Sequence, residues 1–171
     1  GMIDVGDIDS WSFTVCAGDI ISMDVRELVP NSPLTPWLRL YGRDGLLLRT
    51  VFGAATALFT NYSAPASGTY LVVVSDGSSG VGGSGTYRLT VNGLSDELKL
   101  CLPIISGTNV NVVGIGGVPS TPCTLLATTN VAASLGLWTP LTNQFDQFGV
   151  MSITNVFNRS EPQRYFLLRT P

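Results

Sequence analysis

Apolar and polar residues alternate along much of the first 91 residues, and this alternation constrains the fold more than any other feature of the chain. Trp11, Phe13 and Val15 alternate with small polar residues, and the same spacing recurs further on. The other alternating runs are residues 21–25, 38–40, 70–74 and 87–91. Successive side chains of a strand point to opposite faces, so this period predicts half-buried β-strands. No stretch of helix length shows a convincing 3.6-residue period.

Turn residues separate these runs about every 8–12 residues, as in a β-sandwich. Asp44-Gly45 is a hairpin signal, and residues 76–85 form a Gly/Ser loop. Because the segment 92–97 is polar and turn-like, we place a domain boundary there. We predict an all-β protein with a jelly-roll-like β-sandwich over residues 1–94 and a smaller β-sandwich-like module over residues 95–171. Strands of the second module are expected near residues 98–102, 109–115, 123–128, 148–154 and 164–169.

The composition argues against several classes of function. The chain has no histidine, which removes Ser-His-Asp triads, HExxH metalloproteases and His-rich zinc sites. Its 9 basic residues form no cluster, which argues against nucleic-acid binding. No apolar run approaches the roughly 18–20 residues that a membrane span needs. Any general base would be a carboxylate or the single lysine, Lys99, and most carboxylates fall at turns. We therefore predict that the protein is not an enzyme.

The three cysteines, Cys16, Cys101 and Cys123, are too widely spaced for a metal motif or a disulfide framework. Two interpretations stay open. The cysteines could be buried free thiols, or Cys101 and Cys123 could pair within the second module.

Four stretches of the N-terminal half, taken in order, carry a resemblance to a known family. They are residues 6–15, which begin Gly6-Asp7-Ile8-Asp9 and are followed by Ala17-Gly18-Asp19, then Trp37-Leu38-Arg39-Leu40-Tyr41 with Asp44-Gly45, then Ser67-Gly68-Thr69-Tyr70-Leu71-Val72-Val73-Val74, and finally Gly85-Thr86-Tyr87-Arg88-Leu89-Thr90-Val91. Together they resemble the bacterial pre-peptidase C-terminal (PPC) domain. The resemblance implies a jelly-roll-like sandwich appended to secreted hydrolases, with some relatives that bind insoluble polymers such as collagen and some that bind calcium.

The PPC pattern normally begins with one further strand. We therefore expect that upstream sequence, including a signal peptide, is missing from this chain. The C-terminal half is similar to a β tail unit of large secreted bacterial proteins, to which we attach no activity. The matching residues are Thr128-Thr129-Asn130-Val131, Trp138-Thr139-Pro140-Leu141, Phe148-Gly149-Val150 and Pro162-Gln163-Arg164-Tyr165-Phe166-Leu167-Leu168-Arg169.

Four acids are candidate calcium ligands, because Ca²⁺ requires six to eight oxygen ligands. Asp4, Asp7 and Asp9 lie close together in the sequence, and Asp76 begins the Gly-rich loop. In the alternative interpretation, Gly6-Asp7 forms a turn and Asp9 caps a loop through backbone hydrogen bonds. Calcium is the one cofactor that we consider.

A candidate ligand-binding surface lies on the predicted strand at residues 37–41. Trp37, Arg39 and Tyr41 share one face of this strand, and exposed aromatic rings are suitable platforms for sugars or collagen-like chains. Alternatively, both faces of the strand are covered, one of them by the second module. Trp11 and Trp138 lie in apolar alternation, so we place them in the core.

These observations favour a non-catalytic accessory or structural module of a secreted or cell-surface bacterial protein. It would serve as a spacer or an export or maturation domain beside a hydrolase, and its partners would be neighbouring domains of the parent protein. The alternative is a polymer- or carbohydrate-binding module, assisted by calcium, that recognises an insoluble polymer or a surface glycan.

Overall fold

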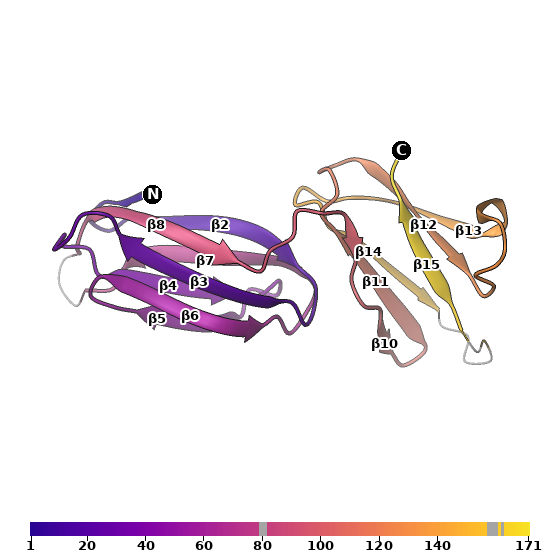
Figure 1. Cartoon of the computed structure of the whole chain (residues 1–171), viewed down its shortest axis with the longest axis horizontal. Helices are drawn as coiled ribbons and strands as arrows, with labels where there is room; N and C mark the ends of the chain where they lie inside the picture. The colour runs from indigo at the N-terminus through magenta and orange to yellow at the C-terminus, as the bar shows by residue number, and fades with distance from the viewer. Residues whose placement is uncertain (79–81, 157–160, 162) are drawn as a thin grey trace. The chain divides into compact units, whose positions relative to one another are not determined.

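The computed structural model describes residues 1–78, 82–156, 161 and 163–171, and these form an all-β protein (Figure 1). The chain divides into two compact units, Gly1–Leu94 and Ser95–Pro171. The division falls within the polar segment at residues 92–97. No α-helix occurs in the described residues, and one short 3₁₀ turn spans Leu135–Leu137. The described part of the chain contains no helix with the length and hydrophobicity of a membrane span.

The described strands of the N-terminal unit form two antiparallel sheets. These strands are β1 (Met2–Ile3), β2 (Ile8–Val15), β3 (Ile20–Glu27), β4 (Pro36–Tyr41), β5 (Leu47–Phe52), β6 (Thr56–Ser63), β7 (Gly68–Asp76) and β8 (Gly85–Asn92). One sheet has the order β1-β8-β3-β6 and the other the order β2-β7-β4-β5. This interleaved order is that of a jelly roll, so the predicted fold class is confirmed.

The core of the N-terminal unit lies between these two sheets and follows the alternation seen in the sequence. In β3, Ile21, Met23 and Val25 are fully buried, and in β4 the same holds for Leu38 and Leu40. Their partners on β7 are Tyr70, Val72 and Val74. Strand β7 lies between β2 and β4, and its outward residues Val73 and Ser75 are buried as well. Leu71 on the same outward face is 40% exposed, so this face of β7 is only partly covered.

The C-terminal unit is a smaller pair of sheets with its own core. Its described strands are β9 (Lys99–Leu100), β10 (Ile104–Ser106), β11 (Asn109–Ile115), β12 (Pro122–Thr128), β13 (Thr139–Gln144), β14 (Met151–Val156) and β15 (Tyr165–Arg169). One sheet has the order β10-β11-β14, with β9 beside β11, and the other the order β13-β12-β15. Val112, Leu125, Phe145 and Met151 pack between them.

All three cysteines are buried, but they differ in chemical state. Cys123 is a free thiol, so it does not pair with Cys101. Burial raises the pKa of the Cys123 thiol, which keeps it protonated and unreactive at neutral pH. The free-thiol interpretation is wrong for Cys16 and Cys101, each of which is in a disulfide bond.

Candidate functional site

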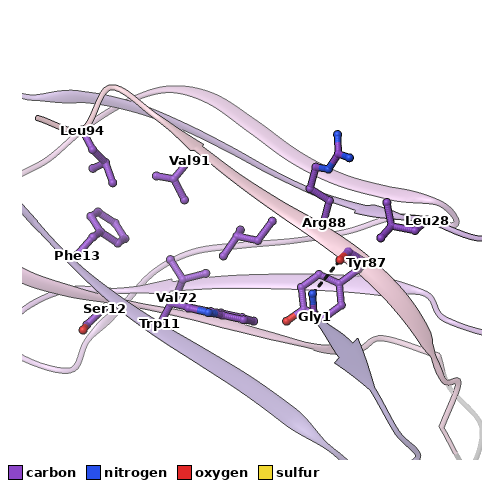
Figure 2. A pocket seen from close by; sticks show the side chains of 11 residues that line it. Gly1, Trp11, Ser12, Phe13, Leu28, Val72, Tyr87, Arg88, Val91 and Leu94 are labelled. Carbon is purple, nitrogen blue, oxygen red and sulfur yellow. Dashed lines mark hydrogen bonds between the residues drawn. The ribbon is translucent and has the colours of Figure 1, made fainter. Parts of the chain in front are cut away.

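An apolar cleft of about 460 Å³ lies at one margin of the N-terminal sandwich (Figure 2). One side is formed by β2 and β7, and the other by β8. The lining residues are Gly1, Trp11, Ser12, Phe13, Leu28, Val72, Tyr87, Arg88, Leu89, Val91 and Leu94. The only charged side chain in this lining is Arg88. The other lining side chains are aromatic, aliphatic or small, and a surface of this composition suits contact with apolar groups.

The exposure of Trp11 is the most informative feature of this cleft. Trp11 shares the inward face of β2 with Phe13 and the buried Val15, yet it is 38% exposed. Its indole ring makes an edge-to-face contact with Tyr87, with ring centroids 5.9 Å apart. Strand β2 lies at the edge of its sheet and no described strand covers Trp11 from outside. The prediction that Trp11 is a core residue is therefore wrong, whereas Trp138, at 9% exposure, is buried as predicted.

A buried tyrosine closes one end of the cleft. The hydroxyl of Tyr87 donates a hydrogen bond of 2.6 Å to Oδ2 of Asp9. Burial, reinforced by the Asp9 carboxylate, raises the pKa of Tyr87 far above its usual value, so the phenol stays protonated and keeps donating. This hydrogen bond joins β2 to β8, so the Asp9 carboxylate has a structural role.

The second candidate surface is the outer face of the sheet β2-β7-β4-β5. Trp37, Arg39 and Tyr41 lie on this face, half-buried, while the intervening Leu38 and Leu40 are fully buried. Residues that lie opposite one another on paired strands share a face. Trp37 is opposite Phe52 of β5, which is 71% exposed, and Tyr41 is opposite Leu71 of β7, which is 40% exposed. The sheet therefore presents an apolar and aromatic outer face.

The ring of Trp37 is held in place by its neighbours. Its Nε1 donates a 2.7 Å hydrogen bond to Oγ1 of Thr50. The Arg39 guanidinium lies 4.2 Å from the centroid of the Trp37 ring, and one of its terminal nitrogens donates to Oγ of Ser75 at 3.0 Å. Since the guanidinium covers one side of the indole, only the other side is available for stacking. Phe52 has no such cover and is the more accessible ring of the two.

The acids proposed as calcium ligands do not form one site. The described residues contain no group of three or more His, Cys, Asp or Glu side chains that could hold a metal ion. The N–H of Asp7 donates to the carbonyl of Asp4, and Oδ1 of Asp7 accepts from the N–H of Ile8. Asp9 is bound to Tyr87. The contacts of Asp4 and Asp7 match the turn interpretation of Gly6-Asp7, whereas Asp9 binds the Tyr87 hydroxyl instead of capping a loop through backbone hydrogen bonds.

Asp76 has a structural role in the loop that follows β7. Its Oδ1 accepts from the N–H of Thr35 at 2.8 Å, and its Oδ2 accepts from Gly83 N–H at 2.6 Å and from both the N–H and the hydroxyl of Ser78. Partial burial alone would raise the pKa of Asp76. The hydrogen bonds outweigh this effect and hold the pKa below its usual value. With its oxygens so engaged, Asp76 anchors the loop to the start of β4.

Two residues that contribute to these surfaces, Trp11 and Phe52, are not indicated by the sequence pattern. Trp11 was assigned to the core because its alternation is perfect, and alternation shows which face a side chain occupies but not whether another strand covers that face. Phe52 is the last residue of the segment 46–52. Apolar residues of this segment fall on both faces of the strand, so the pattern does not show which face Phe52 occupies. Its position opposite Trp37 depends on the pairing register of β4 and β5, which the sequence does not display.

No protein-family model and no curated protein matches the chain. Two solved structures of a GH2 beta-galacturonidase from Eisenbergiella tayi, one bound to glycerol and one to galacturonate, align with 95% of this chain at 11% sequence identity and a TM-score of 0.30. The chain spans 33% of the length of those proteins. A likeness this low supports no conclusion about the fold or the function of the chain.

Proposed function

We propose that this protein is a non-catalytic accessory module of a larger secreted or cell-surface bacterial protein, related to the PPC domain that its N-terminal half resembles. The observation that supports this function most directly is the lining of the cleft. It offers aromatic and aliphatic side chains and one arginine, and no acid, cysteine or lysine. Such a surface positions or recognises another polypeptide, and the catalytic groups then belong to a neighbouring domain.

The roles of the acids support the same proposal. A glycosidase needs two carboxylates that flank the bond to be cleaved. Here Asp9 accepts a hydrogen bond from Tyr87, and Asp76 accepts hydrogen bonds from the backbone of Thr35 and from backbone and hydroxyl donors of its own loop. Neither carboxylate belongs to the cleft lining. These acids stabilise the fold, which suits a module that serves as a rigid spacer or as a domain for export or maturation.

The hydrolytic activity of the purified full chain tests this proposal. Casein and a panel of chromogenic glycosides are incubated with the protein, and product release is compared with that in buffer alone. We expect no difference. Product release that disappears in the Asp9→Asn variant, with the fold intact by circular dichroism, would refute the non-catalytic function.

A second candidate function is binding to an insoluble polymer or surface glycan through the outer sheet face. The observation that favours it is the exposed ring of Phe52 opposite Trp37, with Tyr41 and Leu71 on the same face. Aromatic and apolar groups on a relatively flat sheet surface can stack against sugar rings or collagen-like chains. Arg39 would contribute a polar contact at the margin of this surface.

Depletion from solution tests the second candidate. The protein is incubated with insoluble collagen, chitin, cellulose and peptidoglycan, each with calcium and again with EDTA, and the unbound fraction is measured. If the face binds, Phe52→Ala should weaken binding about tenfold, because stacked aromatic contacts contribute about 0.5–1.5 kcal/mol beyond their buried area. Leu58→Ala is the matched control, since Leu58 is a 55% exposed residue on β6 of the other sheet. Absence of depletion by every polymer would eliminate this candidate.

A further inference from the structure

The C-terminal unit contains a long stretch of sequence without charge. No Asp, Glu, Lys or Arg occurs between Lys99 and Asp146, although 12% of the whole chain is charged. Within this stretch, the connection between β12 and β13, residues 129–138, is exposed over most of its length. Charged side chains are common on exposed loops because they keep a protein surface soluble. An exposed connection without any of them therefore calls for a physical explanation.

Three large aliphatic side chains of this connection are exposed to solvent. Val131 is 57% exposed, Leu135 52% and Leu137 76%. The last pair of the β12–β13 hairpin is Ala127 with Thr139, so the connection extends beyond the end of its sheet (Figure 1). We call residues 129–138 the apolar loop. Because it protrudes, it is suited to enter an apolar phase rather than to receive a ligand.

Many polar groups of the apolar loop are hydrogen-bonded within the loop itself. Three backbone N–H groups donate to carbonyls of the same loop, namely Ala133 to Asn130, Leu137 to Ser134 and Trp138 to Leu135. Oδ1 of Asn130 accepts from the N–H of Ala132, and Nε1 of Trp138 donates to the carbonyl of Ala133 at 3.0 Å. A polar group that already has a partner costs much less to remove from water than an unpaired one. These bonds therefore lower the cost of burying the loop in an apolar environment.

The base of the apolar loop carries side chains with an apolar body and a polar end. Trp138 closes the loop and is buried there. The start of β15 lies beside the base, because Nε2 of Gln163 donates to the carbonyl of Thr129 at 3.4 Å and the Tyr165 hydroxyl donates to Oε1 of Gln163 at 3.0 Å. Arg164 lies between these two residues in the chain. Tryptophan, tyrosine and arginine are the side chains that concentrate at the headgroup level of a membrane.

We propose that the apolar loop docks on a lipid bilayer. Val131, Leu135 and Leu137 enter the boundary between headgroups and acyl chains, about 5–10 Å deep, which is the usual depth of interfacial segments. Trp138 and Tyr165 then lie near the headgroups. The contact is peripheral, and the apolar loop inserts without crossing the bilayer.

The absence of charge from the loop favours a bilayer over a pocket on another protein. Protein interfaces combine an apolar centre with a polar rim and about one hydrogen bond per 100–200 Å². The apolar loop has no charged side chain for such a rim, and several of its donors are engaged within the loop. Insertion into lipid requires no specific partner groups, and no charge has to leave water, which would be the largest cost of insertion. Uncharged neutral lipid is therefore the matching surface.

This inference goes beyond the proposed function, because the cleft and the outer sheet face both belong to the N-terminal unit. The two can fail separately. Hydrolytic turnover would refute the non-catalytic function and leave the lipid assignment standing, while absence of lipid binding would refute only this assignment.

Flotation of the full chain with phosphatidylcholine vesicles tests the proposal. We expect the protein to float with the vesicles and to do so equally in low salt and in about 0.5 M NaCl, which screens charge interactions. Leu137→Ser should weaken partitioning about tenfold, and Leu135→Ser with Leu137→Ser about a hundredfold, because each leucine buries its side chain in lipid. Val118→Ser is the matched control and should have no effect. Val118 is 67% exposed and precedes β12, whereas the apolar loop follows this strand.

Quenching of tryptophan fluorescence by brominated phosphatidylcholine locates the contact. The chain has three tryptophans, so a Trp11→Phe, Trp37→Phe variant leaves Trp138 as the only one. Vesicles that contain the brominated lipid should quench Trp138, because it lies at the base of the inserted loop. Addition of Leu135→Ser and Leu137→Ser to this variant should abolish the quenching.

Four results would overturn the proposal. They are absence of flotation, flotation that requires phosphatidylglycerol and disappears in about 0.5 M NaCl, an equal loss of flotation in Val118→Ser and Leu137→Ser, and bound protein whose Trp138 is not quenched. A dimer in sedimentation without vesicles, dissociated by Leu137→Ser, would overturn it in favour of contact between two copies of this chain.

Discussion

Replacement of Leu38 by alanine should lower the free energy of unfolding of the N-terminal unit by about 2–5 kcal/mol, as is usual when a fully buried leucine is truncated. Leu38 is 0% exposed and lies in the middle of the core between the two sheets. Leu125→Ala should cost the C-terminal unit a similar amount, because Leu125 is equally buried in the second core. Since the two leucines belong to separate cores, each loss should be confined to the unit that carries the substitution.

Urea unfolding followed by NMR peak intensities separates the two units, because every amide reports on its own surroundings. The Leu38→Ala variant should lower the transition midpoint of amides within residues 1–94 and leave that of amides within residues 95–171 unchanged. The Leu125→Ala variant should do the opposite. Leu58→Ala, at a 55% exposed position, is the control and should change stability by less than about 1 kcal/mol. Equal shifts of both units in either variant would show that the chain unfolds as one cooperative body.

Replacement of Asp76 by alanine should destabilise the N-terminal unit by about 2–3 kcal/mol. The carboxylate accepts hydrogen bonds from Thr35, Ser78 and Gly83, and its removal leaves these donors without a partner. Hydrogen bonds to charged groups contribute more than neutral ones, about 1.5–3 kcal/mol each, but solvent can replace part of them because Asp76 is only half-buried.

The same carboxylate should make stability depend on pH. The pKa of Asp76 is lower in the folded protein than in the unfolded chain, so the unfolded chain takes up the proton first on acidification. The stability that Asp76 contributes is therefore fully present above the unfolded pKa of about 4 and is lost as the pH falls through the folded pKa. Chemical denaturation at a series of pH values between about 7 and 2 measures this loss.

Asp76→Asn distinguishes this effect from general acid sensitivity. The asparagine variant should start from a lower stability at pH 7 and then lose less than the wild type on acidification. Asp4→Asn is the matched control, because Asp4 is an exposed acid in the same unit, and it should leave the acid-dependent loss unchanged. If Asp76→Asn retains the full acid-dependent loss, the carboxylate does not have the structural role assigned to it.

The fold class could be predicted because alternation is a local property of the chain. Ile21, Met23 and Val25 are buried at every second position, as the pattern requires. Strand β6 was not predicted, because Leu58 points outward and the register of β3 and β6 shifts between Ile21 and Met23, so the period is broken. Strand β13 was missed because its only aliphatic residue besides Pro140 is Leu141. Short or bulged strands carry too few alternating residues to be recognised.

The candidate sites also contain some features that the local sequence pattern predicts and others that it does not. That Trp37, Arg39 and Tyr41 share one face of a strand could be predicted from the two-residue period alone. The tertiary structure was needed to show that Phe52 lies opposite Trp37, that Tyr87 donates a hydrogen bond to Asp9 and that Trp11 is partly exposed. These three facts depend on which strands pair and in which register. Pairing joins residues far apart in the chain, so no local pattern encodes it.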